Sequence, residues 1–290
     1  MNIGWSPATG SVSVHGTLIN NGVIYTNSGS ELILIGTGSQ VLKNVSTIDK
    51  LKIENSNGVS LEGDITVNSL SLINGFLDIG AHDLTLTGTT THGSSSSYIR
   101  LSSTGKVKAT VGSGSTIFPV GRNPYLPVII SNGDGAEYSV GVADNVYVNP
   151  ATSEDVISVN SVSETWSIQS STSATDVSIQ VGWDAGEETT GFTRASSVLG
   201  YWESGVSTAW QKGTLSGATG SDPYFQTVTM STMSTNLYYF GVGSGGAALP
   251  VELTHFSAQW QTEGESALLT WQTATETNNS HFLIERSFDG

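Results

Sequence analysis

The chain lacks cysteine, so no disulfide can stabilise it and its compartment cannot be inferred from a cysteine pattern. It is also poor in charge, because Asp, Glu, Lys and Arg make up 12% of its residues, about half of the usual ~25%. No apolar run approaches the ~18 residues of a membrane helix, and residues 1–5 lack the basic start of a signal peptide. We therefore expect no membrane insertion. The chain is either cytosolic or an exported protein without its original amino terminus, and we favour the second interpretation.

Positive charge is scarce as well, and the net charge is −15. Residues 1–110 hold six Lys/Arg and seven Asp/Glu, a net charge of −1, whereas residues 111–290 hold four and eighteen, a net charge of −14. Such a negative field repels nucleic acid and anionic lipid, so we expect no nucleic-acid partner. Neutral glycans, proteins and divalent cations remain as partners. The simpler interpretation is that the carboxylates only keep an exported protein soluble.

What the chain does contain is the composition of an all-β protein. Val, Ile, Thr and Tyr recur in short runs between Gly, Asn, Asp and Ser, and no helical period persists. Between about residues 16 and 88, turn sequences such as Asn57-Gly58 and Asn74-Gly75 separate runs of three to five residues. This spacing predicts a β-solenoid, a parallel β-helix, in residues 1–97. A meandering antiparallel sandwich is the alternative for the same residues.

Residues 98–243 show the alternation of half-buried antiparallel strands, for example in Thr165–Ile168. Joined by glycine-rich and acidic loops, these strands predict a β-sandwich of the size of one domain. The small residues of the segment 244–249 then predict a flexible linker.

Residues 250–290 contain three more alternating runs, Val251–Phe256, Ala267–Trp271 and Phe282–Ile284. A β-sandwich normally needs about seven strands. We therefore expect this segment to be the incomplete start of a fibronectin-III-like or Ig-like sandwich, and we interpret the chain as a fragment whose last domain continues beyond Gly290.

Several segments resemble large secreted proteins of Bacteroidetes. The resemblance is carried by Ile48–Val67 with Leu70–Ile79, by Phe118-Pro-Val-Gly121, and most specifically by Leu249-Pro-Val-Glu-Leu253 together with Phe282–Gly290. The last two look like the fibronectin-type-III-like module that precedes a sorting domain in cargo of the type IX secretion system. The resemblance covers nearly the whole chain. It implies a multidomain surface protein and an export route, but it implies no catalytic family.

Catalytic patterns are weak in this sequence. The five histidines are scattered without metal-ligand spacing, and no Gly-x-Ser-x-Gly elbow is present. A lyase site, suggested only by analogy with other β-helices, would need acids such as Asp64, Asp78 and Asp83 grouped with a basic residue on one rung. Glu187 and Glu188 are adjacent and would point to opposite faces of a strand, which does not suit a glycosidase pair. We expect no enzyme in this chain.

Two kinds of binding site are conceivable. Asp134, Asp184, Glu187 and Glu188 are hard oxygen ligands in loops, so calcium is the one cofactor that we consider. The simpler interpretation of these residues is a set of solvated acidic turns.

Aromatic residues suggest the second kind of site. Tyr201 and Trp202 are neighbours, and Trp202 lies eight residues from Trp210, as on two strands of a hairpin, so Trp202 and Trp210 could stack against sugar rings. Because adjacent residues of a strand face opposite sides, one of Tyr201 and Trp202 should be in the core. The alternative is that Trp166, Trp183 and one of this pair fill the sandwich core while the other covers an edge.

Two functions follow as hypotheses. The first is a non-catalytic structural or adhesive segment of a secreted or cell-surface bacterial multidomain protein. The second is a carbohydrate-binding module attached to a polysaccharide-active enzyme outside this chain. Either would act outside the cell or on its outer surface, on a glycan or a protein, and we expect a monomer.

Overall fold

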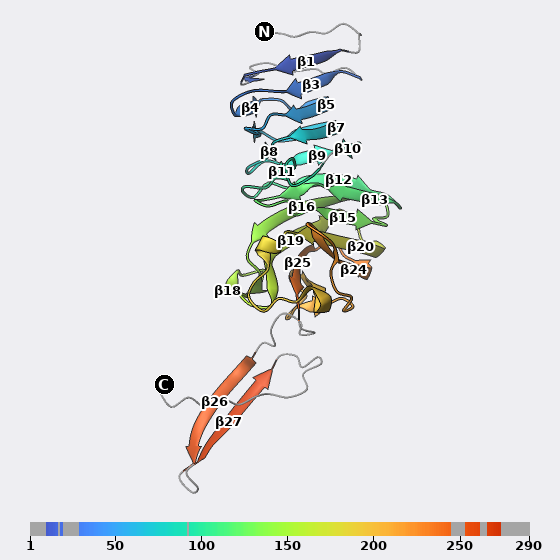
Figure 1. The fold of residues 1–290 in the computed structure, drawn as a ribbon. Coiled ribbons are helices and arrows are strands. Elements are labelled where there is room, and N and C mark those ends of the chain that lie inside the picture. The colour runs from blue at the N-terminus through green and yellow to red at the C-terminus, as the bar shows by residue number, and fades with distance from the viewer. Residues whose placement is uncertain are drawn as a thin grey trace.

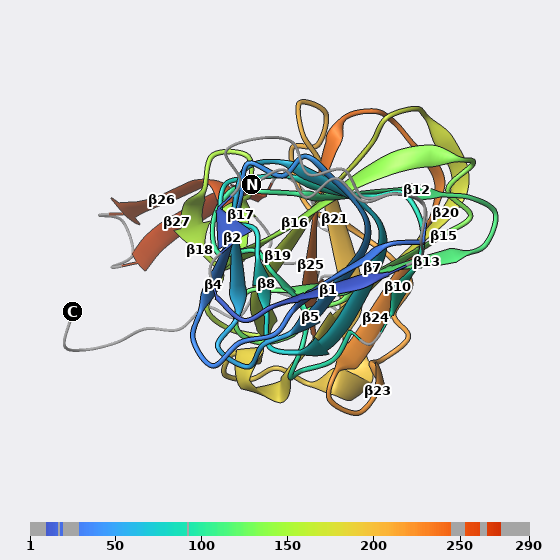
Figure 2. The same ribbon diagram turned by 90° about the horizontal axis from the view of Figure 1, so that it is seen from above.

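The computed structural model describes residues 10–16, 18–19, 29–91, 93–244, 253–261 and 266–273. The protein is all-β, as the composition predicts, with a solenoid of about five turns followed by antiparallel sheets. In Figure 1 the solenoid rungs stack above the sandwich, and the described residues also include a separate hairpin. Figure 2 looks down the stack, where the successive rungs superpose.

The solenoid consists of two parallel sheets, and the chain passes from one to the other in each turn. The first sheet contains β1 (Ser11–Val14), β3 (Glu31–Leu34), β5 (Thr47–Glu54), β7 (Ile65–Asn74), β9 (Leu84–Leu86) and β12 (Val107–Val111), with β10 (Thr90–Thr91) paired to β7. The second contains β2 (Leu18–Ile19), β4 (Gln40–Lys43), β6 (Val59–Glu62), β8 (Leu77–Asp78), β11 (Ile99–Arg100) and β14 (Val120–Gly121). The parallel β-helix prediction is therefore confirmed, and the parallel pairing continues past residue 97 as far as Gly121.

Inward-facing aliphatic residues explain why these short strands are stable. Leu32, Leu51 and Leu70 are register partners in three successive rungs, and each is 7% exposed or less. The side chains between them alternate outward, which is the period-2 pattern of a strand with one covered face. Burial of such a leucine stabilises the fold by about 2 kcal/mol relative to leaving it exposed. A rung alone would leave these side chains in water, so the rungs stabilise one another by stacking.

Polar residues hold the corners in register. Asn55 is fully buried, and its amide donates to the Gln40 side-chain oxygen at 2.8 Å and to the Gly38 carbonyl at 2.8 Å. Gln40 in turn donates to the Val14 and Gly16 carbonyls of the rung above. The predicted Asn74-Gly75 turn lies beside Asn55, where Gly75 has a φ of +78° and a Cβ would be 1.8 Å from the Asn55 carbonyl oxygen. Only glycine fits that corner.

Strand β12 joins the solenoid to the sandwich. On one side it pairs with β9 in parallel, and on the other it pairs with β16 (Ala136–Asp144) antiparallel. The first solenoid sheet therefore continues without a break into the sandwich, and one hydrophobic core extends through both parts, from Leu32 to Val242.

The sandwich has two antiparallel sheets, as predicted. The sheet that continues from β12 adds β16, β19 (Ser161–Ser170), β25 (Leu237–Gly243), β21 (Val198–Glu203) and β22 (Gln211–Lys212). The opposite sheet contains β13 (Ser115–Phe118), β15 (Val128–Ser131), β20 (Ala174–Trp183), β24 (Tyr224–Met233) and β23 (Thr219–Gly220). Trp166 on β19 and Trp183 on β20 are fully buried between them, as one of the two interpretations of the tryptophans expects.

Short elements complete the sandwich. Strands β17 (Tyr147–Asn149) and β18 (Glu154–Val156) form a small hairpin, and two single-turn 3₁₀ helices, η1 (Ala185–Glu187) and η2 (Arg194–Ser196), lie in the connection from β20 to β21. No helix among the described residues is long and apolar enough to span a membrane.

Strands β26 (Leu253–Gln261) and β27 (Ser266–Thr273) pair as an antiparallel hairpin. Their register places Phe256, Ala258 and Trp260 on the same face as Trp271, Leu269 and Ala267, so one face of the hairpin is apolar. Phe256 is 60% exposed and Trp260 is 64% exposed. The third predicted strand, Phe282–Ile284, and the linker residues 245–249 lie outside the described residues.

Candidate functional site

Several polar and charged contacts lie in the connection between β20 and β21, residues 184–197, which we call the junction loop. It crosses from one sheet to the other at the end of the sandwich where β25 finishes (Figure 1). Three of the residues predicted as calcium ligands, Asp184, Glu187 and Glu188, belong to it. Their contacts show what the loop can do.

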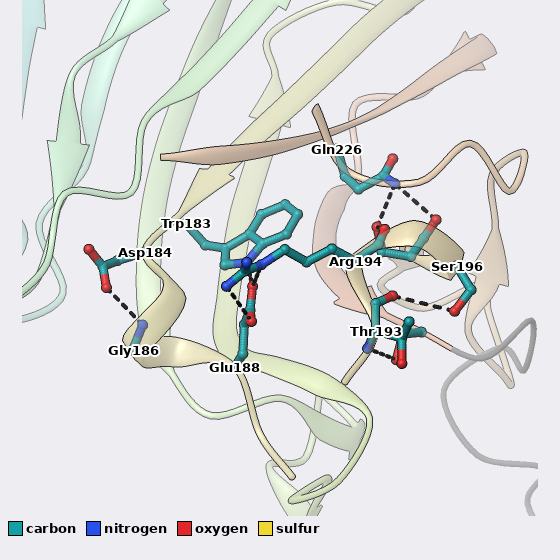
Figure 3. Close-up of polar contacts among 10 residues, drawn as sticks. Trp183, Asp184, Gly186, Glu188, Thr193, Arg194, Ser196 and Gln226 are labelled. Carbon is teal, nitrogen blue, oxygen red and sulfur yellow. Dashed lines mark hydrogen bonds and ion pairs between the residues drawn. The ribbon is translucent and has the colours of Figure 1, made fainter. Parts of the chain in front are cut away.

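Glu188 and Arg194 form the central ion pair of the loop. Arg194 Nε donates to Glu188 Oε1 at 2.6 Å and its Nη2 donates to Oε2 at 2.9 Å, so the guanidinium binds the carboxylate with two parallel hydrogen bonds. The buried Trp183 indole also donates to Glu188 Oε1, at 3.0 Å. Figure 3 shows the three side chains converging, Trp183 from β20 and the other two from the loop. Hydrogen bonding to Glu188 raises the pKa of Arg194 above its ordinary value.

Residues of β24 (Tyr224–Met233) contact the ion pair and the end of the junction loop. The Arg194 guanidinium carbon lies 3.8 Å from the centroid of the Tyr224 ring, a cation–π contact. Gln226 lies two residues after Tyr224 on the same strand and is buried. Its side-chain amide donates to the carbonyl and the hydroxyl of Ser197, both at 2.9 Å. Every charged group of this cluster therefore has a partner, which is the arrangement of a structural clamp.

Asp184 and Glu187 have local partners too. Asp184 caps η1, because its Oδ1 accepts from the Gly186 backbone N–H at 2.8 Å (Figure 3). The Glu187 Oε2 and carbonyl oxygens are each 3.1 Å from the hydroxyl of Ser163 on β19. Glu187 therefore points toward β19 and away from Glu188, whose side chain turns to Trp183.

Beside Glu187 lies an acid that the sequence interpretation did not select. Glu164 on β19 is 3% exposed, and its Oε2 has no hydrogen-bond partner among the described residues. It sits opposite Asp144 in the β16–β19 register. Burial, together with the negative charges of Glu187 and Asp144 and hydrogen bonding to Glu187, raises the pKa of Glu164 to about 9, against the attraction of Arg122. Glu164 is therefore an uncharged acid at neutral pH.

A sequence signal for Glu164 was available. Val162, Glu164, Trp166 and Ile168 alternate along β19 and all are buried, so Glu164 occupies an inward position of a strand. An acid at such a position is buried only if it is paired or neutral.

The calcium prediction joins residues that the structure separates. Asp134 lies in the turn before β16 and accepts from the Thr175 backbone N–H at 2.9 Å, at the start of β20. Asp184 follows the other end of this ten-residue strand, which is about 30 Å long at ~3.3 Å per residue. Among the described residues no three His, Asp or Glu side chains are grouped so that they could hold a metal ion.

The predicted sugar-binding residues are covered by other side chains. Trp202 and Trp210 are 5% and 7% exposed, and their rings meet edge to face at 6.2 Å in a small cluster with Val146 and Ile157. Trp210 Nε1 donates to the Tyr147 carbonyl at 2.9 Å. Tyr201 faces the other side of the strand and packs against the main core, as the alternation predicts. Neither tryptophan presents the open ring face on which a sugar stacks.

The solenoid acids pair between adjacent rungs. Asp78 on β8 binds Arg100 on β11 at 2.6 Å and also accepts from Ser102, and Asp83 binds Lys108 at 2.7 Å. Each of these two acids therefore forms an ion pair with a residue of the next rung of the stack.

Comparisons with known proteins assign no family to this fold and junction loop. No family model, no curated protein and no solved structure matches the chain.

Proposed function

We propose that this chain is a non-catalytic structural segment of a secreted or cell-surface bacterial multidomain protein, which holds the modules on either side of it at a set separation. The observation that carries the proposal is the double pairing of β12, which makes the solenoid and the sandwich one sheet with one core. A joint without a flexible link transmits orientation as well as distance, which suits a spacer or a stalk.

The contacts of the charged residues support this proposal. Asp78 with Arg100 and Asp83 with Lys108 connect neighbouring rungs, and Glu188 with Arg194 closes the end of the sandwich. These groups are directed at one another within the protein. An adhesive role would then reside on the outer surface, toward a glycan or a protein outside the cell.

Distance measurements between two spin labels test the spacer proposal directly. Because the chain has no cysteine, Ser56→Cys in the solenoid and Thr214→Cys in the sandwich, both at exposed positions, can be labelled without other changes. We expect one narrow distance distribution. A matched pair with both labels in the sandwich, Thr214→Cys with Glu154→Cys, sets the width that the labels themselves contribute. A broad or bimodal distribution across the joint, wider than this control, would contradict a rigid spacer.

Binding to insoluble polysaccharides and to a glycan array, with and without calcium, tests the adhesive part and the carbohydrate-binding alternative. A spacer gives no specific retention. Specific retention that survives changes at Trp202 and Trp210 would place an adhesive site elsewhere on the surface, whereas loss of retention in a still folded Trp202→Ala, Trp210→Ala variant would support the sugar-binding alternative.

A further inference from the structure

We propose that the outer edge of the first described rung, formed by β1 and β2, is an interaction surface for one more solenoid rung, supplied by a segment amino-terminal to β1. We call this surface the first-rung edge. In Figure 1, β1 lies at the end of the stack farthest from the sandwich. The inference rests on the proposed spacer function and extends it, because it names what the solenoid holds at this end.

The first step is that successive rungs present the same surface to one another. Val12, Leu32, Leu51 and Leu70 are successive register partners in parallel strands, 20, 19 and 19 residues apart. Each inner strand of this run uses one edge for the rung before it and the other edge for the rung after it. Among the described residues, no strand pairs with the second edge of β1 or with that of β2. The first-rung edge is therefore the same kind of surface that β3 presents to β1.

The second step is the burial of the inward residues, which increases with distance from this edge. Val12 and Val14 occupy the inward positions of β1, but both are only half-buried. In the same row, Leu32 is 7% exposed and Leu51 is 1% exposed. Leu18 on β2 is half-buried as well. A rung stacked on β1 and β2 would remove the remaining aliphatic surface from water, and such burial is what already stabilises the other rungs.

The third step is that the first-rung edge lacks the residues that protect sheet edges from pairing. Natural edge strands carry lysine or proline, contain bulges or are very short. The sequence of β1 is Ser-Val-Ser-Val and that of β2 is Leu-Ile, without charge or proline, and β1 keeps an unbroken register over its four residues. The inner strand β5 carries Lys50 and Lys52 on its outward face. At the far edge of the same sheet, β22 has two residues, one of which is Lys212.

These observations define the chemistry of the partner. A segment as long as one rung, 19 or 20 residues by the spacing of the register partners, would place one strand on β1 and one on β2. Its inward side chains must be aliphatic to cover Val12 and Val14, whereas a polar residue can lie beside Ser13. Backbone hydrogen bonds provide affinity in such a strand addition, and the inward side chains select the register.

The test extends the intact chain by a copy of one of its own rungs. Residues 31–49 run from the start of β3 to the start of β5. A copy of them replaces residues 1–10, so that Ser11 follows the copy as Lys50 follows the original. The control extension contains the same residues in scrambled order. Hydrogen exchange of the amides of residues 11–14 is measured in both proteins.

We expect the copied rung to slow this exchange by about tenfold or more relative to the scrambled extension, because β1 changes from an edge strand to an inner strand. Val12→Lys in the chain with the copied rung should remove most of the protection, since it places a charge on the inward face. Ser13→Lys, on the exposed outward face, is the matched control and should keep the protection.

Equal exchange in the two extended proteins would overturn the proposal. A dimer of the unextended chain that Val12→Lys abolishes would also overturn it, because the first-rung edge would then bind a second copy of this chain. The spin labels measure the joint between solenoid and sandwich, whereas exchange measures pairing at β1. Failure of the spacer proposal and failure of this inference are therefore distinguishable.

Discussion

The ammonium group of Lys106 crosses the backbone of Gly141 to reach the hydroxyl of Ser167, at a distance of 2.9 Å. Lys106 precedes β12, Gly141 is on β16 and Ser167 is on β19, so the Lys106 side chain spans β16, the sandwich strand that pairs with β12. Burial lowers the pKa of Lys106, against the attraction of Asp83. Where the solenoid meets the sandwich, the half-buried Lys106 side chain therefore packs directly over Gly141, where a larger residue would not fit.

Substitution of Gly141 should weaken this joint. A Cβ there would lie 2.1 Å from Lys106 Nζ and 2.7 Å from Ser167 Oγ, so Gly141→Ala is expected to cost about 1–3 kcal/mol of unfolding free energy through overpacking. Urea unfolding measures the loss. In the double variant with Lys106→Ala much of it should be recovered, since the crossing side chain is gone. Gly112→Ala, where a Cβ meets nothing within 4 Å, is the control. Equal losses at Gly112 and Gly141 would contradict this account.

Acid should weaken the solenoid through Asp78. Burial favours a higher pKa for this acid, but the hydrogen bonds from Ser102, Arg100 and the Gly80 backbone outweigh burial and leave its pKa below the ordinary value. A lowered pKa contributes stability that is present above the unfolded-state pKa and is lost as the pH falls through the folded-state pKa.

We therefore expect Asp78→Asn to cost about 1–2 kcal/mol at pH 7 and much less near pH 2, where the wild-type carboxylate is itself protonated. Thermal unfolding at both pH values provides the comparison. Asp176→Asn, at an exposed acid on β20 with φ +51° that asparagine also tolerates, should be nearly neutral at both. A loss at Asp78 that does not change with pH would mean that packing alone is affected.

Above pH 5, Glu164 should make the free energy of unfolding fall as the pH rises, which is the opposite of the effect of Asp78. A raised pKa means that the folded state holds a proton which the unfolded state has released, so stability falls as the pH rises from about 4.5 toward about 9. One such proton changes the unfolding free energy by at most about 1.4 kcal/mol per pH unit. We expect the wild type to lose stability relative to Glu164→Gln across this range, as measured by urea titrations at pH 6, 7 and 8. Parallel pH profiles of the two proteins would show that Glu164 does not bind the proton.

The indole of Trp183 should make Glu188→Ala more damaging than Glu188→Gln. Both variants remove the ion pair with Arg194, but glutamine keeps an oxygen that can accept from the buried Trp183 Nε1. Leaving that donor without an acceptor costs about 1–3 kcal/mol, and this is the expected difference between the variants in urea unfolding. Trp183 fluorescence reports the local change. Variants of equal stability would show that the ion pair alone matters.

Loss of the Trp210 ring should destabilise the small cluster that it forms with Val146, Ile157 and Trp202. Trp210→Ala is expected to cost about 3–5 kcal/mol, and Trp210→Phe about 1 kcal/mol through the lost bond to Tyr147. Hydrogen exchange between residues 145 and 160 should rise in the alanine variant, because Val146 and Ile157 lose their cover. If Trp210→Ala left stability unchanged while it abolished retention on a glycan, the ring would belong to a binding site after all.

The fold was largely predictable from the sequence because its determinants are local. Alternation in the segment around Leu51, together with turns such as Asn74-Gly75, is enough to indicate short strands with one buried face. The solenoid follows from stacking such strands, since each inward leucine needs the next rung to cover it. The same alternation correctly separated Tyr201 from Trp202 onto two faces of one strand.

The candidate sites were not predictable in the same way, because they depend on which distant segments become neighbours. Asp134 and Asp184 have the same chemistry in the sequence, but the length of β20 separates them. The outward face of Trp202 could have met solvent, and it is covered only because the segment around Val146 and Ile157 folds over it.

By itself the sequence determined an all-β chain, the inward residues of each strand and the corners that need glycine, since these depend on side-chain alternation and backbone sterics within a few residues. The tertiary structure decided that β12 unites solenoid and sandwich, that Trp210 is covered, and that Glu164 lies beside Glu187. Those outcomes depend on register between segments far apart in the chain, and burial, which sets the charge of an acid, exists only once these segments have packed.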